Sequence, residues 1–150
     1  MIDIKNEKLE IYKEYVLMSD KHSVKRNQSN AYFITIISGI FIGYAYVLDK
    51  KILQEYANLI QFSISILGLV LCFAWKSNII SYKELSIAKF RVIHEMEKQL
   101  AFAPFTKEWE IVRKNNQKYK QITKTETIIP IICLIPFIAL LINSFIVYLR

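Results

Sequence analysis

Three long stretches of the sequence contain no Asp, Glu, Lys or Arg. They cover residues 27–48, 56–75 and 127–149, each is 20 to 23 residues long, and each is rich in Ile, Leu, Val and Phe. A helix needs about 20 residues to cross the ~30 Å hydrocarbon core of a bilayer. A charged side chain at its centre would cost about 2.5–3.5 kcal/mol. The sequence therefore predicts an all-α membrane protein with three transmembrane helices.

The uncharged stretches also divide the 150-residue chain into segments. The polar parts between them have helical spacing of apolar residues, so we expect them to be helices that extend the membrane helices. The predicted segments are a cytoplasmic amphipathic helix over 1–30, spans over 31–48, 56–75 and 128–149, a short outer turn over 49–55, and a cytoplasmic helical hairpin over 76–127.

The basic residues are distributed very unevenly along the chain. Of the 20 Lys and Arg residues, 17 lie in 1–30 and 76–126, whereas the outer turn and the C-terminus together carry three. Because cytoplasmic loops are enriched in Lys and Arg, the N-terminus is predicted to be cytoplasmic and the C-terminus to lie outside. The net charge of +7 is then explained by the orientation of the chain in the membrane and by attraction to anionic lipid. The basic residues are interleaved with Glu and form no stripe, so no nucleic-acid partner is expected.

Glycine and proline placement indicates where the polar helices begin and end. Residues 3–30 contain neither residue, so we expect one helix that runs directly into the first span. The second span should likewise continue past the membrane, because no Gly or Pro lies between Gly68 and Pro104. Pro104 is expected to end that helix. Thr106 is then expected to cap a further helix over 107–123.

Residues that could support catalysis or metal binding are few. All three glycines lie inside apolar runs, which excludes a phosphate-binding loop. His22 and His94 each lack a second ligand at helical i, i+4 spacing, so both are read as ordinary helix residues. Cys72 and Cys133 lie inside spans and are read as small packing residues. We therefore expect no enzymatic activity, no metal and no cofactor.

Small and polar side chains within the spans indicate which helix faces are in contact. Small residues allow two helix backbones to approach closely in a membrane. The residues assigned to helix packing are Thr35, Gly39, Gly43 and Gly68. A second set follows one face of the second span and either packs against other helices or lines a pore; it comprises Asn58, Gln61, Ser65 and Cys72. No span contains an ionisable residue, which argues against proton relay or charge-selective transport.

The cytoplasmic helices carry narrow apolar stripes, which indicates that they pack on each other or on another subunit. The residues predicted to join subunits there are Tyr82, Phe90, Ile93, Pro104, Phe105 and Trp109.

Part of this region resembles a known family. The stretch 75–97, together with Leu100, the Pro104-Phe105 pair and the Glu108-Trp109 pair, is similar to the RipA family of octameric bacterial membrane proteins. The N-terminal arm is similar through Tyr12, Tyr15, Asp20, Arg26, Asn30 and Thr35. The chain departs from that pattern in having Ser86 where Asn is expected and Ala101 where Pro is expected.

The resemblance implies a homo-octameric protein of the bacterial inner membrane, linked to stress or intracellular growth and without an assigned enzyme activity. More loosely, the chain is similar to the SLATT effectors of bacterial conflict systems, which are predicted to open pores when a nucleotide-signalling partner triggers them. The chain contains no nucleotide-sensing module, so any trigger would be a separate protein or ligand. Two hypotheses remain: a membrane ring, or a pore-forming, channel-like effector in bacterial defence.

Overall fold

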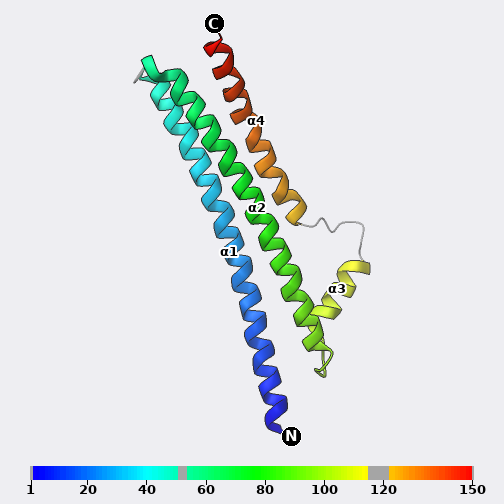
Figure 1. The fold of residues 1–150 in the computed structure, drawn as a ribbon. Helices are drawn as coiled ribbons and strands as arrows, with labels where there is room; N and C mark the ends of the chain where they lie inside the picture. The colour runs from blue at the N-terminus through cyan, green and yellow to red at the C-terminus, as the bar shows by residue number, and fades with distance from the viewer. Residues whose placement is uncertain (1, 51–53, 115–121, 150) are drawn as a thin grey trace. The chain divides into compact units, whose positions relative to one another are not determined.

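The computed structural model describes residues 2–50, 54–114 and 122–149, and every regular element in them is helical (Figure 1). Two features of the sequence prediction are confirmed, the all-α class and the presence of three helices long and apolar enough to cross a membrane. The elements are α1 (Ile2–Asp49), the 3₁₀ helix η1 (Gln54–Tyr56), α2 (Ala57–Glu97), α3 (Pro104–Lys114) and α4 (Ile122–Tyr148).

The chain forms two compact units. Unit 1 comprises Met1–Asn27 and Ser81–Ile122, and unit 2 comprises Gln28–Ile80 and Thr123–Arg150. Helices α1 and α2 each contribute to both units. The three charge-free stretches fall almost entirely in unit 2, which is therefore the part of the chain suited to a bilayer.

Unit 2 is a three-helix assembly of α1, α2 and α4. Aromatic rings connect the helices: Phe41 of α1 stacks on Phe137 of α4 with ring centroids 4.7 Å apart, and Phe33 stacks on Trp75 of α2 at 5.8 Å. Between residues 61 and 79, the buried positions of α2 recur at alternating intervals of four and three residues, the spacing by which helices pack nearly parallel to one another. The buried apolar core consists of Ile37, Cys72, Trp75, Ile79 and Phe137.

Unit 1 is built on the N-terminal half of α1 and the C-terminal part of α2. Its contact surface is unusually polar, because Ser19 and His22 of α1 are both buried there. The Nε2 atom of His22 lies 3.2 Å from the backbone carbonyl oxygen of Tyr82, and the two rings are 4.9 Å apart. Ile93 supplies a fully buried apolar contact. A buried polar group such as the His22 ring is tolerated because it has a hydrogen-bond partner.

The second long helix ends earlier than predicted. Helix α2 stops at Glu97, and a turn closed by a bond from the Leu100 amide to the Glu97 carbonyl follows it. A proline ring at position 104 would clash with the carbonyl of residue 100 inside a continuous helix, and Ala103 is disfavoured in the α region before proline. Pro104 instead begins α3, where the missing amide hydrogen carries no penalty.

Other predicted boundaries change as well. Thr106 is the third residue of α3, so the prediction that it precedes and caps a helix starting at residue 107 is wrong. Two of the predicted segments lie partly outside the described residues. They are the helix predicted over 107–123, at residues 115–121, and the predicted outer turn, at residues 51–53. Helix α4 continues through both Pro130 and Pro136.

Candidate functional site

Gln61 is the centre of a hydrogen-bonded network inside unit 2. The Tyr44 hydroxyl of α1 donates to Gln61 Oε1 at 2.8 Å, and Gln61 Nε2 donates to the Leu140 carbonyl of α4 at 2.7 Å. A single side chain thus connects all three helices. A bilayer offers no water to satisfy a polar group, so partners of this kind must come from the protein.

The other polar residues on this face of α2 also point into the unit. Ser144 Oγ of α4 donates to Asn58 Oδ1 at 2.7 Å, and Ser65 Oγ donates to the Gln61 carbonyl at the same distance. Ser65 and Cys72 are fully buried. In the structure these side chains lie within one chain, at or near the contacts between its helices.

The three glycines lie in two different environments. A Cβ atom added at Gly68 would overlap the ring of Phe137, so α2 and α4 approach closely there. A Cβ atom added at Gly39 or Gly43 would meet no atom within 4 Å in the described parts of this chain, leaving aside the neighbouring backbone of α1 itself. Thr35, one turn before Gly39, is also exposed, and its hydroxyl donates to the Ala31 carbonyl at 2.9 Å.

Unit 1 contains a site that the sequence analysis missed, centred on the carboxylate of Glu97. The side chain is only 2% exposed. Its Oε1 accepts from the Phe105 amide at 2.8 Å and from the Tyr12 hydroxyl at 3.1 Å. Its Oε2 accepts from the Thr106 amide at 2.9 Å and the Thr106 hydroxyl at 2.6 Å. One carboxylate therefore joins α1, α2 and the start of α3.

This arrangement is a helix cap supplied by a distant residue. The first amides of a helix lack intrahelical partners, and the positive end of the helix dipole favours an anion there. His94 extends the cluster, with Nδ1 3.1 Å from Thr106 Oγ1 and 3.6 Å from Glu97 Oε2. The sequence feature that could have identified this site is Glu97 itself, a carboxylate on the buried face of α2 seven residues before Pro104.

The cluster changes the acidity of two of its members. Burial raises the pKa of Glu97, but the hydrogen bonds from Thr106, Phe105 and Tyr12 outweigh this effect and hold that pKa below its ordinary value. Burial, together with the hydrogen bond to Glu97 and the charge of that carboxylate, raises the pKa of Tyr12 to about 12. The pair therefore consists of an anion and a neutral phenol near neutral pH.

The residues predicted to join subunits lie in different settings. Ile93 is 0% exposed, so it packs inside its own chain. The residue lies on the expected helical stripe, but that stripe faces α1 of the same chain. Pro104 and Phe105 belong to the α3 junction, where the Phe105 ring lies 6.0 Å from that of Phe90. Trp109 is 50% exposed on α3. Tyr82 contacts His22.

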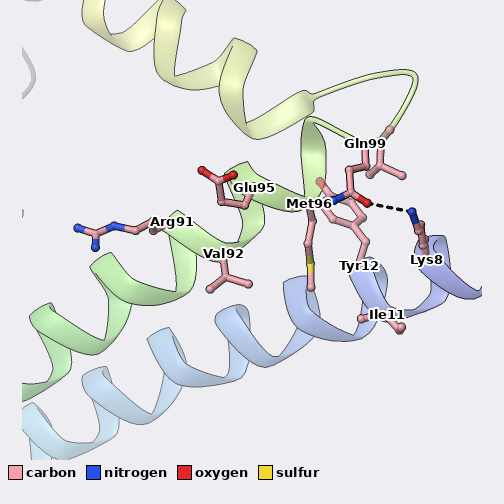
Figure 2. Close-up of a pocket in the computed structure, with 9 residues that line it drawn as sticks. Lys8, Ile11, Tyr12, Arg91, Val92, Glu95, Met96 and Gln99 are labelled. Carbon is pink, nitrogen blue, oxygen red and sulfur yellow. Dashed lines mark hydrogen bonds between the residues drawn. The ribbon is translucent and has the colours of Figure 1, made fainter.

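A groove of about 450 Å³ runs between α1 and α2 in unit 1 (Figure 2). Ile11 lies on its α1 side and Val92 on its α2 side, and Met96 extends from α2 toward α1. Lys8 Nζ donates to Gln99 Oε1 at 3.0 Å across it. The remaining lining residues include the charged side chains of Arg91 and Glu95.

In the described part of the chain, no three His, Cys, Asp or Glu residues are grouped closely enough to hold a metal ion, and both cysteines are free thiols. No curated protein and no solved structure matches the chain. A family does match, over residues 9–146: the octameric membrane protein family (8xMP). This match spans nearly the whole sequence and agrees with the three candidate spans, and the chain belongs to that octameric membrane protein family.

Proposed function

We propose that the protein is a non-enzymatic scaffold of the bacterial inner membrane that assembles as a ring of identical subunits, with eight copies as the family name indicates. In this proposal the N-terminus and unit 1 are cytoplasmic and the C-terminus is outside, because 17 of the 20 basic residues lie on the N-terminal side of the membrane. The similarity to the RipA family extends the proposal to a role in bacterial stress or host adaptation. Deleting the gene should then reduce survival under stress and leave ordinary growth unchanged.

The observation that carries the proposal is the exposed face of α1 in unit 2. Ala31, Thr35, Gly39 and Gly43 recur there at every fourth position and are all exposed. Ile42, which is 70% exposed, lies next to Gly43 and three residues after Gly39. In a membrane such small-residue faces are where helices of different chains approach, because van der Waals packing drives their association.

The exposed surface of α4 is different in kind. It consists mainly of isoleucines, among them Ile135, Ile138 and Ile142, which suit contact with lipid chains. We infer that α1 faces the neighbouring subunit and α4 faces lipid. Membrane lipid is then the other partner of the assembly.

Replacing Gly43 with Ile tests this assignment, because the added side chain would separate helices that meet at the α1 face. The native mass of the purified protein in mild detergent should fall from that of an oligomer toward that of one chain. The matched control is Ala139→Ile, which adds the same side chain at an exposed position of α4. An oligomer that survives Gly43→Ile and is lost with Ala139→Ile would reverse the assignment.

The alternative function is a pore-forming effector in bacterial defence, opened by a separate protein or ligand. The same face of α1 favours it, because exposed Thr35 and Ser38 hydroxyls would line an axis if α1 faced the centre of the ring. This alternative predicts ion flux through liposomes that contain the protein. Liposomes that stay tight while the protein is oligomeric would favour the scaffold.

A further inference from the structure

The two outer surfaces of unit 1 differ, and only one of them is covered by α3. Phe90 faces α3, where its ring meets Phe105. Val92 follows two residues later, about 200° around the helix, so it lies on the other side of α2. That side carries the groove, whose apolar members Ile11 and Val92 are substantially exposed. Exposed apolar surface of this kind, rimmed by charge, is typical of a protein interaction site.

Helix α3 has an exposed surface of its own. Ile111 is 61% exposed and lies five and six residues from Thr106 and Phe105, which places it roughly on the far side of α3 from the Glu97 junction. Glu108 and Lys114 lie three residues before and after it, on the same side of the helix. None of the residues of α3, all of which are described, is buried in its own chain.

The two surfaces are complementary in charge, and each has an exposed apolar centre. The groove has an apolar floor with Arg91 and Glu95 at its edge, and both side chains extend away from α1 (Figure 2). The exposed face of α3 has one large apolar side chain between a carboxylate and an ammonium group. Placing Ile111 over the groove would allow Arg91 to meet Glu108 and Glu95 to meet Lys114. The bond that Glu95 now makes with Lys98, at 2.7 Å, is solvent-exposed and therefore readily exchanged.

From this complementarity we propose that the groove between α1 and α2 in unit 1 receives the Ile111 face of α3 from a second copy of the chain. The contact joins two different surfaces of the same molecule, so repetition around a closing rotation generates a ring. Each copy would offer its groove to one neighbour and its α3 to the other. The inference rests on the proposed self-assembly and adds the surfaces that direct it outside the spans.

Disulfide trapping in native membranes tests the proposal. The background carries Cys72→Ala and Cys133→Ala, and each chain then receives one new cysteine, either Val92→Cys or Ile111→Cys, with tags of different size. Oxidation of the co-expressed pair should give a covalent heterodimer, whereas each variant alone should give none. Leu17→Cys replaces Val92→Cys as the control, because Leu17 is an exposed apolar residue of unit 1 outside the groove, and it should not form a dimer with Ile111→Cys.

A charge exchange provides an independent measurement. Arg91→Glu should lower the yield of oligomer, and the double variant Arg91→Glu with Glu108→Arg should restore it. Two results would overturn the groove assignment and leave the proposed function standing. One is a disulfide dimer of two Val92→Cys chains. The other is a protein with the native mass of an oligomer that gives neither the Val92–Ile111 heterodimer nor recovery by the double charge variant. If the parent protein has the native mass of one chain, the proposed function falls together with this inference.

Discussion

Glu97 shows how one residue can determine the placement of a whole helix. Its carboxylate accepts four hydrogen bonds from α1 and α3, and a hydrogen bond to a charged group contributes about 1.5–3 kcal/mol. Glu97→Gln removes the charge and turns one acceptor toward the amides into a donor. We expect hydrogen exchange of the α3 amides to increase, by an amount that corresponds to about 2 kcal/mol. Tyr12→Phe, which deletes only the bond at 3.1 Å, should have a smaller effect.

The same junction predicts a dependence on pH. Because the pKa of Glu97 is lowered in the folded chain, its contribution is fully present above its ordinary pKa of 4.5 and is lost as the pH falls through the lower, folded value. Protection of the Phe105 and Thr106 amides should therefore decrease in acid relative to the Glu97→Gln protein measured at the same pH. Equal pH profiles for the two proteins would show that the carboxylate does not hold α3.

The hydrogen bonds of Gln61 in unit 2 lead to a second prediction about side-chain bonds. Gln61→Leu removes the partner of the Tyr44 hydroxyl and the donor to Leu140. Interhelical hydrogen bonds in membranes contribute about 0.6 kcal/mol on average and at most about 1.7 kcal/mol, so we expect a loss of unfolding free energy of about 1 kcal/mol. The double variant with Tyr44→Phe should cost less than the sum of the single variants in detergent unfolding. Strict additivity would indicate that the two side chains do not interact.

At the scale of elements, the contact between α2 and α4 depends on the absence of a side chain at Gly68. A methyl group there would overlap the Phe137 ring. Gly68→Ala should therefore destabilise the chain by about 1–3 kcal/mol, the usual cost of overpacking a core. Adding Phe137→Leu to Gly68→Ala should recover part of the loss, because a smaller side chain leaves room for the methyl group. Thermal unfolding in detergent measures both, with Phe137→Leu alone as the reference.

The helices differ in how far the sequence alone could predict them. Long uncharged stretches identify membrane helices because their signal is local. The placement of α3 depends instead on side-chain contacts, in which Glu97 accepts from Phe105 and Thr106 and from Tyr12, 85 positions earlier in the chain. The packing partner of Ile93 could not be predicted for a related reason. Helical periodicity identifies a stripe of contact residues, but it does not tell whether the stripe meets the same chain or another one.

At the scale of the whole molecule, the uneven distribution of basic residues predicts one orientation in the membrane. In a background of Cys72→Ala and Cys133→Ala, Tyr148→Cys should react with an impermeant maleimide added to spheroplasts, because Tyr148 is highly exposed at the end of α4 that is predicted to lie outside. Glu10→Cys should react only after lysis. Labelling of Glu10→Cys in intact spheroplasts would place the N-terminus outside.

The hydrogen bonds around Gln61 also bear on biogenesis. Gln61 bonds to Tyr44 and Leu140, and Ser144 bonds to Asn58, all within a single polypeptide, so a newly inserted monomer can form these contacts without another copy. Membrane helices are thought to insert individually first and to pack against one another in a second stage. In the proposed assembly, a monomer can therefore form these bonds before it joins other copies, and a subunit that leaves the ring keeps these groups paired.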